Sequence, residues 1–403
     1  MKKKSQVQNP FARHKHRMRR PESRPILFDL SRAGDRAGLD KLLKSGRVAE
    51  ICDTYTHQLR ELFAIENPPL ALGSGFEKAF AGYHAALLKE APDWQRGSWV
   101  FYPWLSTLVH VLPHSEFHRV RTARNRTLIS SGEQKRFYDA TIAIAGLSIG
   151  NSAALGIALQ GGARRMKLAD LDVMNLSNLN RIRAGVDSLG IPKVEITARQ
   201  IYLIDPYAEP ELFTEGLTEK NIGEFFKGAD LVIDEFDDFA MKRLLREHAQ
   251  KHRIPLISGA DVGESAVIDV ERYDTDPQTR PFHGRIPDMD FKAMKGLDTR
   301  AIGGLIAQLV GLENHNTRML EWPNHLGQAG GIVSFPQLGG TALLNGSFVA
   351  YCAFAILAGY PVKNGRTEIS LEHLFLADSY FSKEMRAEHR KALSALKKML
   401  NIG

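Results

Sequence analysis

The sequence has little cysteine and no long uninterrupted apolar run. Only two cysteines, Cys52 and Cys352, occur in 403 residues, which excludes a disulfide framework and a four-cysteine zinc site. No apolar run reaches the ~18 residues that a membrane span needs, and no apolar stretch follows the charges at the N-terminus. We therefore expect no structural zinc, no membrane span and no secretory leader, with a cytoplasmic location as the default.

Acidic residues are also scarce at the start of the chain, where the basic charge is concentrated. Residues 1–24 hold nine Lys and Arg and a single acid, Glu22, so this segment carries more than the whole net charge of +7. It has too few apolar residues to fold, and we expect a disordered basic tail. A solvated leader is the simpler interpretation of the charge, and contact with nucleic acid stays possible without further support.

Two regions of different patterning follow the tail. Residues 25–118 predict a small α+β extension without a catalytic constellation, and residues 119–403 predict one larger α/β domain. In the extension we expect a short strand or extended segment at 25–30, helices at 35–44, 47–66 and 76–90, and a strand pair or one buried strand at 98–113. From residue 141 strands and helices alternate, which favours a doubly wound, mainly parallel Rossmann-like sheet.

The last third of the chain changes composition twice. Residues 274–335 are rich in Gly, Pro and polar side chains, which predicts long loops that carry function or interfaces. Residues 336–360 are apolar but interrupted by Gly, Asn and Ser, which favours a buried helix at a dimer interface over a membrane span. Residues 381–400 predict a basic amphipathic helix.

A nucleotide-binding unit is predicted at residues 141–181. An apolar strand leads into a turn of small residues and an Ala-rich helix, and a second strand ends at Asp170. Backbone N–H groups at the start of such a helix face an anion, and an acid about 20 residues after the turn suits a ribose hydroxyl. The turn residues expected to contact the nucleotide are Gly146, Ser148, Gly150 and Asn151.

Polar residues after this unit suit ATP better than a dinucleotide. Arg181 and Lys193 would supply two fixed positive charges for a polyphosphate, and Asn178 offers an amide. Asp237 follows a buried strand, where an acid can hold Mg²⁺ together with substrate phosphates. Each of these residues alone would be an ordinary polar residue on the surface. Their order after a βαβ unit is specific for a nucleotide site.

These motifs resemble the ThiF/MoeB/HesA adenylyltransferases, the ATP-using core of ubiquitin-type activating enzymes. The resemblance covers roughly residues 119–275, with a fainter return at 330–361, and its most specific piece is LADLDVMNLSNLNR. The helix that starts at Lys193 and the segment VIDEFDD add to it. The N-terminal extension, with its WVFYPW segment, looks like that of a bacterial subgroup of ThiF-like proteins.

The resemblance assigns roles to individual residues. It implies that Asp170, in the acid-x-acid pair with Asp172, binds the ribose, and that Asp237 is essential for Mg²⁺ and catalysis. The residues expected to contact phosphates are Asn178, Arg181 and Lys193. Arg126 would reach the ATP of the other subunit of a homodimer.

The implied reaction is adenylation. A carboxylate, such as the C-terminus of a small ubiquitin-like or sulfur-carrier protein or of a peptide, attacks the α-phosphate of Mg-ATP, and pyrophosphate leaves. The protein positions the reacting groups and neutralises charge. Because neither paired Cys-x-x-Cys ligands nor a catalytic cysteine is present, we predict no zinc and no covalent cysteine step.

Two alternatives remain open. One is an ATP-dependent tRNA-modifying enzyme of the same fold. In that case the basic tail would help to hold the tRNA. The other is a nucleotide-binding module with weak turnover, because Ser148 and Asn151 stand where the family has its second and third glycines. A nicotinamide-dependent oxidoreductase would not need Arg181, Lys193 and Asp237 together.

Overall fold

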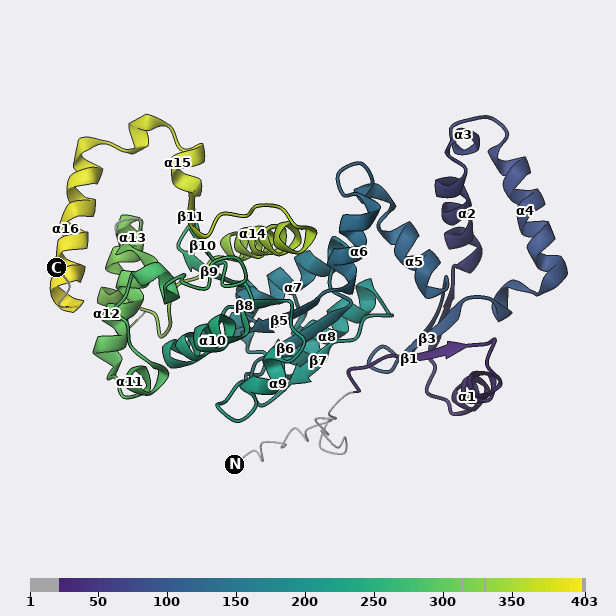
Figure 1. Ribbon diagram of the computed structural model, residues 1–403, viewed down its shortest axis with the longest axis horizontal. Coiled ribbons are helices and arrows are strands. Elements are labelled where there is room, and N and C mark those ends of the chain that lie inside the picture. The colour runs from purple at the N-terminus through teal and green to yellow at the C-terminus, as the bar shows by residue number, and fades with distance from the viewer. Residues whose placement is uncertain (1–21, 313–314, 330, 401–403) are drawn as a thin grey trace, which may run out of the picture.

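The computed structural model describes residues 22–312, 315–329 and 331–400, and it contains two separate sheets (Figure 1). The larger sheet has the strand order β11-β10-β9-β8-β5-β6-β7. Its strands are β5 (Thr141–Ala145), β6 (Arg165–Ala169), β7 (Glu211–Phe213), β8 (Leu231–Asp234), β9 (Leu256–Val262), β10 (Ser265–Glu271) and β11 (Gly365–Ser370). Every pairing from β9 through β7 is parallel, and only β10 and β11 are antiparallel. The predicted mainly parallel α/β sheet is therefore confirmed.

The chain changes direction across the sheet beside β5. It runs outward from β5 to β6 and β7, and then returns to place β8 and β9 on the other side of β5. Ligands of open α/β sheets bind at the carboxyl ends of the strands at such a switch point. The crevice between the ends of β5 and β8 is consequently where a nucleotide is expected.

Helices cover both faces of the large sheet. Side chains of β5 alternate between the faces, so Ile142 and Ile144 pack with α7 (Ile149–Leu159), α8 (Lys193–Ile204) and α14 (Gly339–Ala358). Ala143 and Ala145 face the opposite cluster, formed with α9 (Ile222–Phe226) and α10 (Phe239–His252).

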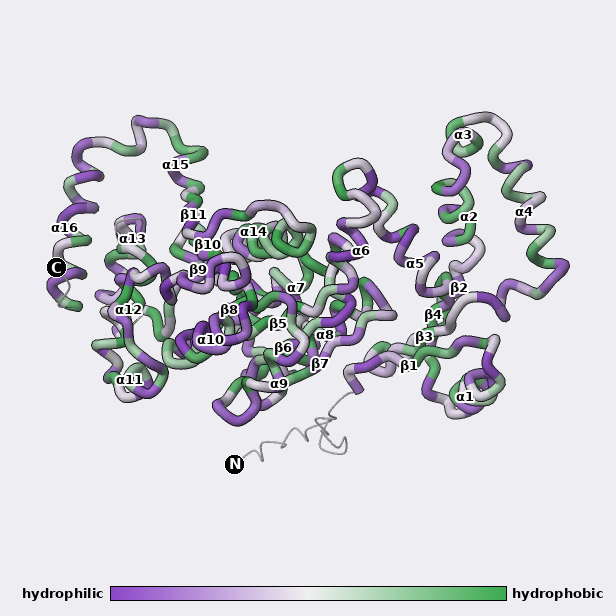
Figure 2. Tube along the Cα trace, in the orientation of Figure 1, coloured by the Kyte–Doolittle hydropathy of each residue, from purple (hydrophilic) through white to green (hydrophobic). Residues whose placement is uncertain are grey.

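Helix α14 is mostly apolar, although Gly, Asn and Ser interrupt it (Figure 2). By length and composition it passes the test for a membrane span, but 61% of its apolar window is buried inside the protein. It packs on α7 and on β8, β9 and β10, so the predicted buried helix is confirmed. Its place at a dimer interface stays a prediction.

The smaller sheet belongs to the N-terminal extension and has the order β1-β3-β4-β2. Its strands are β1 (Ile26–Asp29), β2 (Glu50–Asp53), β3 (Ser98–Tyr102) and β4 (Thr107–Val111), and its helices are α1 (Ala33–Lys44), α2 (Tyr55–Glu66), α3 (Pro68–Ala71) and α4 (Phe76–Glu90). The predicted helix at 47–66 is wrong in its first part, because β2 pairs with β4, a partner that local periodicity cannot reveal. The hydroxyl of Tyr102 donates to the carbonyl of Tyr202 at 3.1 Å, which ties the extension to α8.

The connection between the sheets is helical. It consists of α5 (His114–Arg121), which crosses the predicted boundary at residues 118 and 119, and α6 (Ser131–Asp139). The domain boundaries stay a prediction. The predicted disordered tail at 1–24 lies outside the described residues except for its last three.

The region predicted as long loops contains helices, so that prediction is wrong in part. These are α11 (Phe291–Lys295), α12 (Thr299–Val310) and α13 (Thr317–Glu321). The side chains of Asp290, Asp298 and Asn316 each accept the backbone N–H three residues later, which is an N-cap. The chain then forms α15 (Leu371–Phe375) and α16 (Lys383–Leu400), and α16 confirms the predicted amphipathic helix.

Candidate active site

The turn after β5 depends on a glycine. Gly146 has φ +88°, and its N–H donates to the carbonyl of Ala169 at 2.8 Å. A Cβ at this position would lie 2.4 Å from the carbonyl oxygen of Glu235, just beyond β8. The ends of β5, β6 and β8 therefore meet here, directly before the N-terminus of α7. Contact of this turn with a nucleotide stays a prediction.

Two acids after β6 share one lysine. Asp170 is buried and accepts the N–H groups of Leu147 at 2.7 Å and Asp172 at 2.8 Å. Lys193, the first residue of α8, lies 2.7 Å from Asp172 Oδ2 and 3.9 Å from Asp170 Oδ2. Burial raises the pKa of Asp170, and the lysine ammonium opposes the shift. The structure thus brings the predicted ribose acids and a predicted phosphate ligand together, and a phosphate would have to draw Lys193 away from Asp172.

Ser148, which replaces a family glycine, holds the predicted phosphate-binding arginine. It is the N-cap residue of α7, and its Oγ accepts a hydrogen bond from Arg181 Nε at 2.8 Å. Burial lowers the pKa of Arg181, while the charges of Asp237 and Asp261 oppose that shift. The substitution therefore gives the turn a side-chain contact that aims a cation at the N-terminus of α7.

The third glycine of the G-x-G-x-x-G motif permits close packing of the helix on the sheet. Asn151 stands at that position here, and Gly150 permits the close packing instead. A Cβ on Gly150 would lie 3.2 Å from Ile144 Cγ2 and 3.4 Å from Glu235 Cγ, so this glycine permits close packing of α7 on the sheet. Asn151 is fully buried, and its amide donates to Thr197 Oγ1 at 2.9 Å and Gln200 Oε1 at 2.7 Å. Its amide thus binds α8, and a contact of Asn151 with the nucleotide stays a prediction.

Asn178 and Asp237 differ in how freely they can meet a ligand. Asn178 is buried, and its Oδ1 accepts the N–H of Asn175 at 3.0 Å, so its carbonyl end stabilises its own turn. Asp237 is exposed in the loop after β8. The next residue, Asp238, caps α10 by accepting the N–H of Met241 at 3.0 Å. Of the two adjacent acids, Asp237 is the one without a structural role among the interactions of the described residues.

Arg126 lies against the N-terminal extension. Its Nη1 donates to the carbonyl of Ile65 in α2 at 3.3 Å, and the side chain is exposed. Within the described part of the chain, no interaction joins it to the other predicted site residues. A role for Arg126 at the site of a partner subunit stays a prediction.

The sequence analysis missed a set of buried oxygens beside this turn, the acceptor cluster of Glu235, Asp261 and Asn345. The three residues are 7%, 5% and 0% exposed and come from the end of β8, from β9 and from α14. Asn345 Nδ2 donates to Asp261 Oδ1 at 3.1 Å. Among the described residues, both carboxylate oxygens of Glu235, Asp261 Oδ2 and Asn345 Oδ1 have no hydrogen-bond partner.

Burial shifts both acids of the acceptor cluster. It raises the pKa of Glu235 to about 8 against the opposing charge of Lys242, and the carboxylates of Asp234 and Asp261 add to the rise. Burial also raises the pKa of Asp261 to about 6, while Asn345 and Arg181 oppose the shift. The one signal in the sequence was Glu235 itself, an acid that directly follows an apolar strand.

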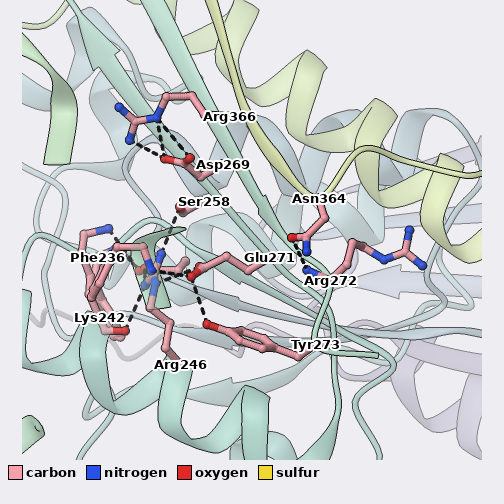
Figure 3. Close-up of polar contacts among 12 residues, drawn as sticks. Phe236, Lys242, Arg246, Ser258, Asp269, Glu271, Arg272, Tyr273, Asn364 and Arg366 are labelled. Atoms are coloured by element: carbon pink, nitrogen blue, oxygen red, sulfur yellow. Dashed lines mark hydrogen bonds and ion pairs between the residues drawn. The ribbon is translucent and has the colours of Figure 1, made fainter. Parts of the chain in front are cut away.

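A second set of buried charges, the Arg246 network, surrounds the guanidinium of Arg246 (Figure 3). Arg246 Nη1 is 2.6 Å from Asp234 Oδ2, and Arg246 Nε is 2.8 Å from Glu271 Oε2. The guanidinium also lies 3.9 Å from the ring centre of Phe282. Tyr273 donates to Glu271 at 3.0 Å. This network joins β8, α10 and β10 beneath the candidate site.

The donor set fits a Mg²⁺ ion held mainly by a nucleotide. Within the described ranges, no group of three or more His, Cys, Asp or Glu residues could hold a metal ion. Mg²⁺ is commonly bound through one or two carboxylates together with substrate phosphates and waters. Asp237 is exposed and its charge acts on Arg181, so its carboxylate matches that requirement, and a bound ion would neutralise phosphate charge.

Curated relatives match part of the chain. The chain is 31% identical over 307 residues to an uncharacterized protein of Mycobacterium tuberculosis (strain CDC 1551 / Oshkosh), covering 76% of this chain and 42% of that protein. It is 30% identical over 164 residues to the tRNA threonylcarbamoyladenosine dehydratase of Bacillus subtilis (38% and 64%) and 28% identical over 147 residues to the molybdopterin-synthase adenylyltransferase of Haemophilus influenzae (36% and 60%). The chain thus spans less than two thirds of the length of each.

Solved structures and a family profile complete the comparison. The Escherichia coli tRNA N6-threonylcarbamoyladenosine dehydratase TcdA is 20% identical, with a TM-score of 0.43 over 59% of this chain and 94% of that chain. PaaA is 17% identical, with a TM-score of 0.45 over 64% and 68%. The ThiF family profile matches residues 122–391, well over half of the sequence. The chain belongs to the ThiF family.

Proposed function

We propose that the chain uses ATP to adenylate a carboxylate, and that pyrophosphate is released. The observation that carries the proposal is the convergence of Arg181, Lys193 and Asp170 at the switch point, with Arg181 fixed by Ser148 at the N-terminus of α7. Two cations and a helix N-terminus are suited to a polyphosphate, and a buried acid is suited to a ribose. Relatives named adenylyltransferases support this activity.

The acceptor that we propose is the C-terminus of a small carrier protein or a peptide. The relatives named molybdopterin-synthase adenylyltransferase and sulfur carrier protein ThiS adenylyltransferase support this choice. The cysteines support a mechanism that ends at the acyl-adenylate. Cys352 lies in α14, where burial raises the pKa of its thiol, and Cys52 lies in β2 of the extension. A buried thiol with a raised pKa is a poor nucleophile.

Pyrophosphate–ATP exchange with a panel of carboxylates tests the activity. We expect Asp237→Asn to abolish exchange while the thermal unfolding temperature stays unchanged, because Asp237 is exposed. Asp238→Asn is the matched control. It removes the same charge one position away, keeps a good N-cap for α10 and should retain exchange. Near-normal exchange in Asp237→Asn would show that the proposed mechanism is wrong.

A tRNA substrate is the second candidate, favoured by the exposed face of α16. That helix presents Lys383, Arg386, Arg390, Lys391 and Lys398 to solvent. Phosphate-binding surfaces use such clusters and lose affinity steeply with salt. A tRNA affinity that is unchanged when these five residues become Ala would reject this candidate.

We also propose that the protein works as a homodimer through the outer face of α14. Leu343 and Tyr351 are 53% and 62% exposed and lie two turns apart on that face. A second copy would cover them. We expect the native protein to have twice the chain mass by light scattering and Tyr351→Asp to have the mass of one chain. A native mass of one chain would contradict this proposal.

A further inference from the structure

Two neutral oxygens hold the guanidinium of Arg181. Its Nε donates to Ser148 Oγ at 2.8 Å, and its Nη1 donates to Asn180 Oδ1 at 2.9 Å. Two hydrogen bonds to different nitrogens of one planar group fix the direction in which its remaining N–H groups point. Because neither partner is charged, the cation is oriented without being neutralised and stays available for a phosphate.

The amide of Asn180 also connects this arginine to a distant part of the chain. Its Oδ1 accepts from Arg181, while its Nδ2 donates to the backbone carbonyl of Gln337 at 2.9 Å, across 157 positions of the sequence. Asn180 is exposed at the end of the 3₁₀ helix Leu176–Asn180, and Gln337 lies two residues before α14. One side chain therefore joins the predicted phosphate-binding cation to the segment that leads into α14.

A glycine at the start of α14 lets the two segments touch. A Cβ on Gly339 would lie 2.3 Å from the carbonyl oxygen of Asn180 and 3.8 Å from the Cα of Arg181. A side chain is not tolerated so close to a backbone oxygen, so any larger residue would push the segment away from Asn180. A Cβ on the next residue, Gly340, would meet no other part of the described chain within 4 Å. The requirement for glycine is therefore specific to position 339.

We propose that Asn180 is a positioning residue for ATP, which transmits the placement of the segment 337–339 to the guanidinium of Arg181. This inference rests on the proposed function, which supplies ATP as the ligand. An amide suits the role because it accepts with its oxygen and donates with its nitrogen at the same time. A carboxylate would only accept and would neutralise the cation, and an ammonium would only donate. Asn180 itself need not contact a phosphate, because it acts through Arg181.

The bridge acts in both directions. Coupling between two sites is reciprocal, so ATP that holds Arg181 should also steady the segment 331–338 through the same amide. This segment has little packing of its own, since the side chains of Val333, Phe335 and Leu338 are 93%, 39% and 48% exposed. We therefore expect bound ATP to reduce the backbone motion of the segment.

Calorimetric binding of a non-hydrolysable ATP analogue with Mg²⁺ to the full chain tests the role. We expect Asn180→Ala to raise Kd about fivefold, because Arg181 loses one of its two hydrogen bonds. In a chain that already carries Arg181→Met, the same change should leave Kd unaltered, since Asn180 acts only through the guanidinium. An equal rise in both backgrounds, or no rise in the native background, would overturn the proposal.

Two adjacent glycines give a matched pair of variants. Gly339→Ala should raise Kd about fivefold by moving the segment off Asn180, whereas Gly340→Ala should leave Kd unchanged. Both substitutions lie in the same turn of α14, and thermal unfolding shows whether each variant folds. Equal Kd values for the pair would refute the positioning role. If Gly339→Ala does not fold, Asn180→Ala decides, and if Arg181→Met binds too weakly to measure, the glycine pair decides.

Amide hydrogen exchange tests the reciprocal effect. The analogue should slow exchange in residues 331–338 of the native chain and have no such effect in Asn180→Ala. Equal exchange with and without the analogue in the native chain would reject the coupling. Failure of pyrophosphate–ATP exchange with every carboxylate would reject the proposed adenylation and leave the Kd results to decide the role of Asn180. Normal pyrophosphate–ATP exchange with an unchanged Kd in Asn180→Ala would reject only the positioning role, and a native chain that does not bind the analogue would contradict both.

Discussion

Asp234 and Glu235 are neighbours in the chain, yet their carboxyl groups have opposite surroundings. Asp234 faces α10, where it is paired with Arg246 and Lys242. Glu235 faces α7 and β9, where neither of its oxygens has a partner among the described residues. Successive side chains at a strand end point to opposite faces of a sheet, so one residue step separates a carboxylate paired with cations from a carboxyl group without such a partner.

The difference separates structural acids from candidate functional ones. The cations beside Asp234 outweigh its burial and hold the pKa of its carboxyl below the usual value. Burial dominates at Glu235 and raises the pKa instead. An unpaired buried acid adds little to the stability of a protein. Such an acid is therefore expected mainly at functional sites.

The largest effect on stability should come from removing Arg246, the cation that pairs with Asp234. Arg246→Leu leaves Asp234 and Glu271 buried without their common cation, and we expect a loss of ~3–5 kcal/mol of unfolding free energy in urea titrations. Lys251→Leu removes an exposed cation from the same helix and should cost far less. Equal losses in the two variants would mean that the Arg246 network does not hold the sheet to α10.

The carboxyl group of Glu235 should contribute to the pH dependence of the free energy of unfolding. Because Glu235 has a higher pKa in the folded protein than its ordinary value of 4.5, the folded state holds the proton more tightly. The stabilising contribution is complete below the unfolded pKa and is lost as pH rises toward about 8. We expect Glu235→Gln to remove on the order of 3 kcal/mol of that decline between pH 5 and pH 8.

Parallel pH profiles for the native protein and Glu235→Gln would contradict this assignment. The pKa shift of Asp234 has the opposite sign. Its lowered pKa stabilises the fold above the unfolded pKa, and that contribution is lost as pH falls through the folded pKa. Urea midpoints measured across pH therefore separate the two neighbouring acids.

The smallest effect concerns the side chain that connects the turn to the phosphate cation. Ser148→Ala removes the hydrogen bond to Arg181, and we expect ~1 kcal/mol weaker ATP binding, about a fivefold rise in Kd by calorimetry. Ser152→Ala is the matched control on the same helix, because its hydroxyl has no partner in the described structure. Equal Kd values for both variants would show that Ser148 does not position Arg181.

Local signals were sufficient where structure is set by nearby residues. The apolar run of β5, the glycine after it and the acid after β6 predicted the central unit correctly. They failed for β2, which depends on pairing with β4, more than fifty residues away. The helices in the region predicted as loops had a usable signal in the caps Asp290, Asp298 and Asn316, which the overall polar composition concealed.

The candidate site divides in the same way. Asp170, Arg181 and Lys193 lie within one continuous segment, so motif spacing could place them at a common strand end. Gly150 packs α7 onto the sheet, and its contact with a nucleotide stays a prediction. Asn151 was predicted at the nucleotide, but its orientation depends on α8, which packs beside α7 only in the folded chain.

The sequence by itself determined the α/β alternation and the ThiF-like nucleotide motif, because each is encoded in local pattern. Only the tertiary structure decided which buried acids are paired. Glu235, Asp261 and Asn345 come from β8, β9 and α14 and meet through the order of strands in the sheet and the packing of α14. That order results from long-range backbone pairing and burial, which no local pattern specifies.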